Sequence, residues 1–307
     1  MTEFKESTFK SRDGEHDIYY CIWLPEGEPK GIVQIAHGMC EYVGRYDRFA
    51  RFLNDNGYIV CGNDHLGHGS TAEPQDRGYF APKDGFKTVV RDMHTLTTLM
   101  KKEYPGLPYF LFGHSMGSFL SRAYCTWFGS ELDAAVFCGT NGIVKGSEAL
   151  MVMIDAEKCI YGDRYRSRKL TDLVFGGYCK KIENPRTSSD WLTRDDDIVD
   201  IYIQDEKCGF LFTLNGFENL ARMIWFISNE KWFSTLRKDL PVFLIAGDAA
   251  PVGNYGEGVR DVYNKLISYC CNAKLKIYEG CRHELINEIN KEEVYEDVLD
   301  FFNTYRN

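Results

Sequence analysis

Several classes of protein are excluded by what this 307-residue chain lacks. No apolar run reaches the roughly 18 to 20 residues that a membrane-spanning helix needs. Basic residues are outnumbered, with Lys and Arg at 36 against Asp and Glu at 45, for a net charge of −9. An acidic chain is a poor partner for a polyanion, so we expect no nucleic-acid binding. The phosphate-binding pattern Gly-x-x-x-x-Gly-Lys-Ser/Thr is absent as well.

The eleven cysteines lack a pattern too. Their number is odd, their spacing is scattered and no Cys-x-x-Cys occurs, which indicates reduced apolar side chains and no disulfide frame or zinc site. The first ten residues, MTEFKESTFK, lack the apolar core of a signal peptide. The sequence therefore predicts a cytoplasmic protein without a structural metal.

An ordinary balance of 44% hydrophobic and 26% charged residues indicates a globular chain of one large or two average domains. Strand and helix patterns alternate, which predicts an α/β fold with a mostly parallel sheet covered by helices on both faces. We expect strands at 17–24, 31–36, 58–64, 108–113, 134–139, 241–247 and 273–280, the first of them an antiparallel edge strand. We expect helices at 45–56, 84–103, 115–128, 256–270 and 291–305.

Residues 140–240 contain no convincing strand, and a plain loop of that length is not expected in a compact domain. Phe217, Leu220, Ile224 and Ile227 share one helix face. We therefore predict a helical cap subdomain at 140–240 over the carboxyl ends of the strands. Residues 1–139 and 241–307 would form the core domain.

The strongest chemical signal is Gly-x-Ser-x-Gly, formed by Gly113, Ser115 and Gly117 between a predicted strand and a predicted helix. A strand that turns sharply into a helix leaves no room for side chains two residues before and after the serine. A chance match in a glycine-containing turn is the alternative. The flanking strand and helix favour Ser115 as a nucleophile.

Two further parts of such a site can be placed. The loop His37-Gly38-Met39 follows a predicted strand, so the amides of Met39 and Met116 are the candidate oxyanion donors. The ring of His37 is interpreted as a structural group bonded to backbone. Of seven histidines only His283 follows the last predicted strand, which favours it as the general base over a surface histidine. His114 is interpreted as a packing residue.

Asp64, His65 and His68 lie on a glycine-rich loop. Three such close residues make a weak metal site. A loose dinucleotide pattern in the same loop is rejected because no helix follows it.

Taken together, these motifs resemble one family. The chain resembles the monoacylglycerol lipase and lysophospholipase branch of the α/β-hydrolases, which also holds serine aminopeptidase-like hydrolases, over about residues 8 to 305. The resemblance is carried by His37-Gly38-Met39, Gly44-Arg45-Tyr46, Asp64-His65-x-Gly67-His68-Gly69, Gly113-His114-Ser115-Met116-Gly117 and Arg282-His283-Glu284.

The resemblance implies an α/β-hydrolase fold with a helical cap inserted after the sixth strand. It also implies cleavage of carboxylic esters, of the monoacylglycerol or lysophospholipid type, through a Ser-His-acid triad and an acyl-enzyme. No cofactor would be needed, and the partner would be a small ester or lipid substrate.

One position departs from the family pattern. The triad acid of this branch follows the strand read here at 241–247, in a turn whose matching residue is Ala250, which has no carboxylate. Three explanations stay open: an aspartate was removed by substitution, Asp248 acts as a displaced acid, or the protein has become a non-catalytic binder of small ligands. Because losing the triad acid costs on the order of 10⁴ in turnover in serine proteases, we expect this chain to be a poor enzyme.

A peptidase or an acyltransferase on the same scaffold is an alternative to the esterase. Dehalogenase and epoxide hydrolase chemistry is disfavoured, because it needs a carboxylate where this chain has Ser115.

Overall fold

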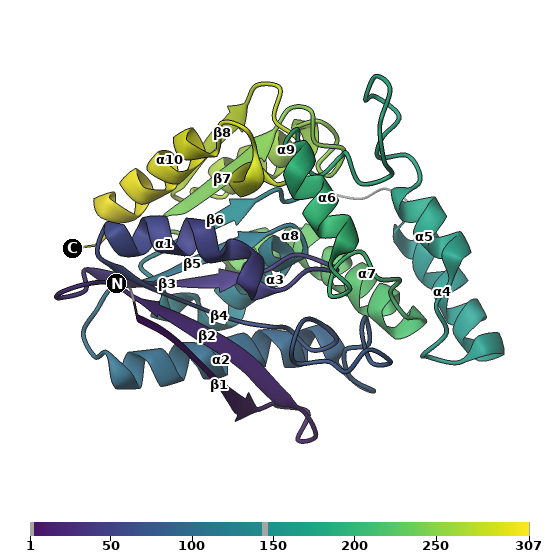
Figure 1. The fold of residues 1–307 in the computed structure, drawn as a ribbon, viewed down its shortest axis with the longest axis horizontal. Helices are drawn as coiled ribbons and strands as arrows, with labels where there is room; N and C mark the ends of the chain where they lie inside the picture. Colours follow the sequence, from purple (N-terminus) through teal and green to yellow (C-terminus); the bar gives the residue numbers. More distant parts are fainter. Residues whose placement is uncertain (1–2, 143–146, 307) are drawn as a thin grey trace.

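The computed structural model describes residues 3–142 and 147–306, which fold around one eight-stranded sheet (Figure 1). The strand order is β1-β2-β4-β3-β5-β6-β7-β8, and β2 pairs antiparallel with both β1 and β4 while all the other pairs are parallel. The strands are β1 Glu3–Lys10, β2 Asp17–Leu24, β3 Gly31–Ala36, β4 Tyr58–Asn63, β5 Tyr109–His114, β6 Ala134–Cys138, β7 Val242–Gly247 and β8 Ala273–Tyr278.

Helices cover both faces of this sheet, as the alternating pattern predicts. The α-helices are α1 Asp47–Asp55, α2 Gly85–Glu103, α3 Met116–Phe128, α4 Ser147–Tyr161, α5 Arg168–Phe175, α6 Asp196–Gln204, α7 Leu214–Ser228, α8 Glu230–Thr235, α9 Glu257–Ser268 and α10 Lys291–Thr304. Apolar residues of α1 and α10 form the core on one face, and those of α2, α3, α8 and α9 form the core on the other (Figure 1). Strands β3 to β7 are buried along their whole length, which is why they read as continuous apolar runs. The predicted α/β fold class is confirmed.

The prediction that 17–24 is an edge strand is wrong. β1 lies outside β2 in antiparallel register, with Phe4 opposite Trp23 and their rings 5.3 Å apart. Almost every residue of β1 is exposed, so the segment shows no alternation of apolar and polar residues. A polar strand held at a sheet edge leaves little trace in a hydrophobic pattern.

The segment predicted as a cap contains helices α4 to α8 and, in the part of it that the structure describes, no strand. Figure 1 shows α4 to α7 beyond the carboxyl ends of the parallel strands. Its last portion also contacts the core, because Trp232 of α8 is buried and donates its Nε1–H to the carbonyl of Arg122 in α3. The division at residues 139/140 and 240/241 stays a prediction.

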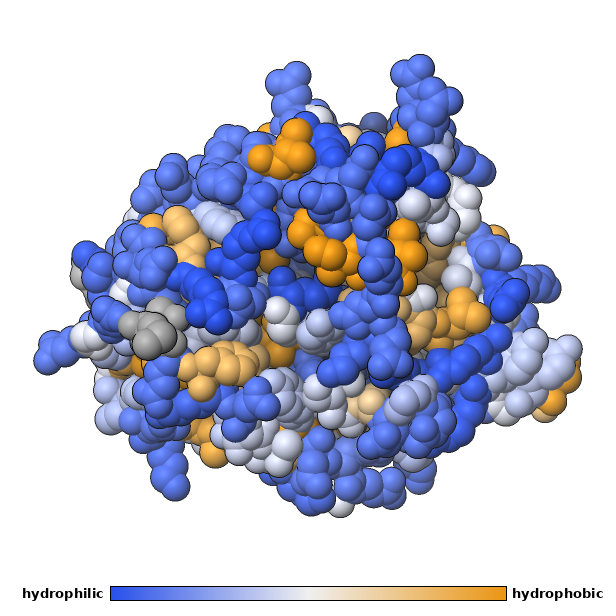
Figure 2. Space-filling model, viewed as in Figure 1, coloured by the Kyte–Doolittle hydropathy of each residue, from blue (hydrophilic) through white to orange (hydrophobic). Residues whose placement is uncertain are grey.

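The face shown in Figure 2 is mainly hydrophilic, with hydrophobic surface gathered around α6. On that helix the side chains of Ile201 and Ile203 are exposed. In the ranges that the structure describes, no helix has the length and apolar character required to cross a bilayer.

Asp92 of α2 makes stability depend on pH. Its carboxylate accepts hydrogen bonds from the hydroxyl of Ser11 at 2.8 Å and the amide of Arg12 at 2.7 Å, and burial raises its pKa to about 7. In the unfolded chain an aspartate ionises near pH 4, at about 3.9. Between these values the folded state retains a proton that the unfolded state releases, so this group lowers the free energy of unfolding as pH rises.

We therefore expect Asp92→Asn to gain stability relative to the parent as pH rises from 4 to 7. The gain approaches ~1.4 kcal/mol for each pH unit between the two pKa values, while a hydrogen bond that the amide fails to accept lowers the stability of the variant equally at every pH. Urea unfolding of both proteins at pH 4, 5.5 and 7 measures it. If the difference in the free energy of unfolding between the two proteins is the same at all three pH values, Asp92 does not retain the proton in the folded state.

Candidate active site

The loops that follow the parallel strands meet at one edge of the sheet. Ala36 of β3 lies opposite Gly113 of β5, and His114 of β5 lies opposite Cys138 of β6, so these strands end at similar heights. In open α/β sheets ligands bind at the carboxyl ends of the strands. A cavity of about 570 Å³ opens there, and its wall includes Ser115 and His283.

Ser115 lies at the turn between β5 and α3, with φ 52° and ψ −120°, a backbone conformation that side chains rarely adopt. A Cβ at Gly113 would lie 2.2 Å from the hydroxyl of Ser121, and one at Gly117 would lie 1.9 Å from the carbonyl of Ala36. Both positions must therefore be glycine. Ser115 itself is half-buried and lines the cavity, at the strand-to-helix turn that the motif predicts.

The predicted oxyanion donors lie beside it. Met39 and Met116 both line the cavity. Met116 is the first residue of α3, and the first amides of a helix have no intrahelical acceptor. Gly38 packs so closely that a Cβ there would lie 3.3 Å from the Cβ of Ser115. The loop after β3 thus reaches the turn at Ser115.

His283 is buried between two aromatic rings, that of His114 at 4.8 Å and that of Trp191 at 5.2 Å. Within the described residues, neither of its ring nitrogens has a hydrogen-bond partner, so no hydrogen bond joins it to Ser115. Burial lowers the pKa of His283 well below its ordinary value, His114 lowers it further, and Glu41 raises it. The imidazole is therefore neutral at pH 7 and free to accept a proton.

Ala250 stands where the resemblance places the triad acid, and it has no carboxylate. Ala250 is fully buried in the turn after β7. Asp248, the candidate displaced acid, is exposed and its Oδ1 accepts the amide of Gly280 at 2.7 Å. This carboxylate makes no hydrogen bond to His283, whose nitrogens are both unpartnered in the described part of the chain.

Comparison with known proteins decides the family. A family described as "Serine aminopeptidase, S33" matches residues 27–290. The chain belongs to this family. It is 28% identical over 304 residues to the monoglyceride lipase of Rattus norvegicus, covering 95% of this chain and 87% of the relative. It is 27% identical over 287 residues to a monoacylglycerol lipase of Mycolicibacterium smegmatis, covering 92% of each.

A solved structure agrees along the whole chain. The thermostable carboxyl esterase of Bacillus coagulans, solved with glycerol, superposes with a TM-score of 0.93, at 32% identity and full coverage of both chains. The α/β-hydrolase fold and the resemblance to the monoacylglycerol lipase branch are thereby confirmed.

In this serine aminopeptidase-family chain, a buried charge network centred on Glu41 and Arg45 was not foreseen from the sequence. Arg45 donates to Glu41 at 2.6 Å and to both carboxylate oxygens of Glu284 at 2.7 Å. The Nδ1 of His114 lies 3.2 Å from Glu41 Oε1, which also accepts the amide of Gly38 at 2.5 Å. Burial alone would raise the pKa of Glu41, but Arg45 and then His114 hold it well below its usual range. The network joins the loop after β3 to the loop that carries His283.

His37, His65 and His68 pack their rings together next to the loop after β3. His37 Nδ1 donates to the carbonyl of Gly38 at 2.8 Å, and its Nε2 accepts the amide of His65 at 2.9 Å. Burial lowers the pKa of His37 and His65, and lowers that of His68 to about 3. No three or more His, Cys, Asp or Glu residues of the described ranges are arranged to hold a metal ion. The ring of His37 makes the backbone contacts that its structural interpretation predicts.

Proposed function

We propose that this chain is built to hydrolyse carboxylic esters of the monoacylglycerol or lysophospholipid type. The observation that carries the proposal is the shared cavity wall: a strained serine turn and a neutral, unpartnered imidazole border the same space. The relatives named as monoglyceride lipases and as a carboxyl esterase support ester chemistry on this scaffold.

In the proposed mechanism, His283 accepts the proton of Ser115 while Oγ attacks the ester carbonyl carbon. The amides of Met39 and Met116 donate to the oxyanion of the tetrahedral intermediate. The intermediate collapses as its bond to the alcohol oxygen breaks, and His283 protonates the leaving alcohol. Water, giving its proton to His283, then attacks the acyl-enzyme, and the carboxylic acid leaves as Ser115 regains its proton.

Ala250 limits this reaction in the chain as it stands. An acid at this position would orient the imidazole and stabilise the imidazolium, and losing it costs on the order of 10⁴ in turnover in serine proteases. The same observation favours a second candidate, a binder of small apolar ligands that has lost its acid. The two candidates differ in what restoring the carboxylate does.

The cavity wall supports an acyl chain as the bound group. Leu173 and Val174 of α5 and Phe217, Leu220 and Ile224 of α7 line it. An apolar cavity with a few convergent polar groups is typical of small-molecule sites. These helices lie in the predicted cap, so we propose that the cap selects the acyl chain.

A substrate panel tests the proposed class. The Ala250→Asp protein is assayed with a dispersed monoacylglycerol, a lysophospholipid and an aminoacyl-naphthylamide. We expect kcat/KM for the better lipid ester to exceed that for the amide by at least about tenfold, a difference of ~1.4 kcal/mol in transition-state binding. Preferred cleavage of the amide would instead make the protein a peptidase, and acyl transfer to added alcohol in place of water would make it an acyltransferase.

A further inference from the structure

The loop that carries His283 is paired with a strip of chain that leads into α6. This strip, defined as residues 190–194, lies along the loop of residues 281–288. The amide of His283 lies 3.4 Å from the carbonyl of Trp191 to which it donates, and the amide of Glu284 donates to the carbonyl of Leu192 at 2.6 Å. The backbone on either side of the base is therefore held by the predicted cap and not only by the core.

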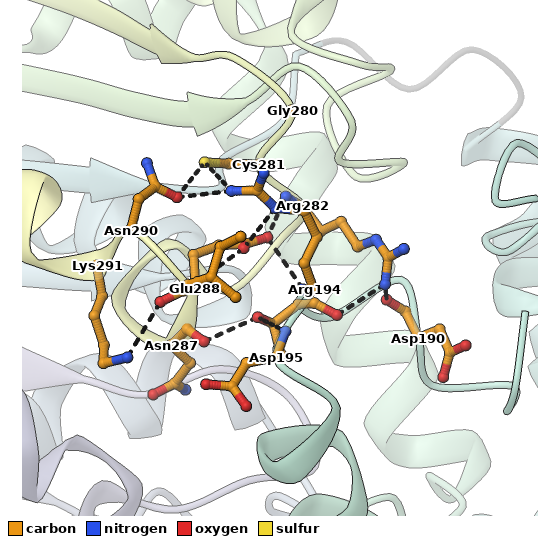
Figure 3. Close-up of polar contacts among 12 residues, drawn as sticks. Asp190, Arg194, Asp195, Gly280, Cys281, Arg282, Asn287, Glu288, Asn290 and Lys291 are labelled. Carbon is orange, nitrogen blue, oxygen red and sulfur yellow. Dashed lines mark hydrogen bonds and ion pairs between the residues drawn. The ribbon is translucent and has the colours of Figure 1, made fainter.

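An ion pair between the partly exposed Arg194 and the buried Glu288 holds this contact at one end. The side chain of Glu288 is fully buried and accepts Nε–H of Arg194 at 2.8 Å and the amide of Arg282 at 2.7 Å (Figure 3). Arg194 also donates from Nη2 to Asn290 Oδ1 at 2.7 Å. Removing one partner of a buried pair is strongly destabilising because it leaves a buried charge uncompensated. If the strip moved away from the loop, Glu288 would either become exposed to solvent or stay buried without its charge partner.

At the other end of the contact the donor comes from the loop, because Arg282 donates to carbonyls of the strip. Its Nη1 donates to the carbonyls of Asp190 at 2.7 Å and Thr193 at 2.9 Å, and Figure 3 shows this side chain reaching across to Asp190. The hydroxyl of Thr193 donates back to the carbonyl of Asn287 at 2.9 Å. Each segment thus donates side-chain hydrogen bonds to the other.

The consequence falls on the imidazole. Trp191, inside the strip, packs its ring against that of His283 in a tilted arrangement, with centroids 5.2 Å apart and planes 36° apart. Neither ring nitrogen has a partner among the described residues, so ring packing and the paired backbone are what hold the base. The orientation of the His283 ring therefore depends on how firmly the strip holds the ring of Trp191 in place.

We propose that Arg194 and Glu288 are positioning residues for His283, acting through the strip and the ring of Trp191. The proposal rests on the proposed function, in which His283 is the base. A carboxylate at position 250 would orient the imidazole by a hydrogen bond. That carboxylate and the Arg194–Glu288 pair would therefore both stabilise the same orientation of the ring. Residues that act on one group are not additive, and a double-mutant cycle measures the coupling.

The test compares Arg194→Ala in two backgrounds, the chain as it stands and the Ala250→Asp protein, using the maximal rate of labelling by a fluorophosphonate probe. We expect a loss of about 10- to 100-fold where position 250 is alanine and of less than about threefold where it is aspartate, because small misplacements of a catalytic group cost rates of this order. Arg194→Lys, which retains a donor for Glu288, is expected to recover part of the rate. Arg222→Ala removes an exposed arginine of α7 that pairs with Glu218, and is expected to change neither background.

Equal losses in the two backgrounds, or no loss in either, would overturn the proposal, since a role in folding alone makes no distinction between them. If Arg194→Ala does not fold, Trp191→Leu takes its place and must show the same background dependence. If the Ala250→Asp protein neither labels nor turns over esters, the proposed function fails separately. The NMR signals of the His283 ring in the parent then decide: a shift with Arg194→Ala but not with Arg222→Ala supports the positioning role, and unchanged signals refute it.

Discussion

Ala250→Asp is expected to raise kcat/KM for a p-nitrophenyl ester by about 10⁴, the factor that a triad acid contributes in serine proteases. The turn after β7 places Ala250 in a buried position, and neither ring nitrogen of His283 has a hydrogen-bond partner among the described residues. A carboxylate there would fix the tautomer of the ring and stabilise the imidazolium. Steady-state hydrolysis of the two purified proteins measures the gain.

Ala249→Asp is the matched control. It adds the same charge to the same turn one residue earlier, at a half-buried position. We expect it to leave turnover at the level of the parent. An equal gain from both substitutions would show that general charge, and not an oriented carboxylate, is what the site lacks.

The pH dependence of the same pair should move in a defined direction. His283 accepts a proton only when it is neutral, and burial holds its pKa well below the ordinary value in the parent. A neighbouring carboxylate favours the charged imidazolium and raises that pKa. The acid limb of the rate profile should therefore lie at higher pH in Ala250→Asp than in the parent, even though the plateau is higher. An acid limb that does not move would mean that another group titrates.

Ser115→Ala in the Ala250→Asp background is expected to abolish ester turnover. In a comparable serine hydrolase, removal of the nucleophile costs on the order of 10⁶ in kcat. Alanine keeps the Cβ that the strained turn already accommodates, so the fold should survive, which circular dichroism and the melting temperature check.

Ser234→Ala is the control for this loss, because Ser234 lies exposed on α8 and its hydroxyl donates to the carbonyl of Lys231. Its turnover should equal that of the Ala250→Asp parent. Retained turnover in Ser115→Ala would remove Ser115 from the reaction.

The sequence predicted those features that local physics imposes. The buried strands β3 to β7 read as apolar runs, and the turn at Ser115 needs glycine on both sides because side chains there would meet neighbouring atoms within 2.2 Å. β1 was missed because a polar edge strand needs no apolar pattern. The position of β1 depends on its backbone pairing with β2, and the residues of β1 alone carry no pattern that predicts this pairing.

The support of the site could not be predicted in the same way. Arg45 and Glu284 are 239 positions apart, and their pairing depends on how the loops after β3 and β8 meet. Both residues stand in motifs that carry the family resemblance, but nothing local gives them a role. Trp191 likewise lies in a segment without a motif, and only the folded chain brings its ring onto His283.

Fluorophosphonate labelling of the Ala250→Asp protein, followed by mass mapping of the adduct, tests the central claim most directly. We predict a single adduct, on the peptide that contains Ser115, which forms faster than in the parent and slows sharply when His283 is replaced by alanine. An adduct on a different serine, or labelling that is indifferent to His283, would contradict a mechanism in which this imidazole activates that hydroxyl.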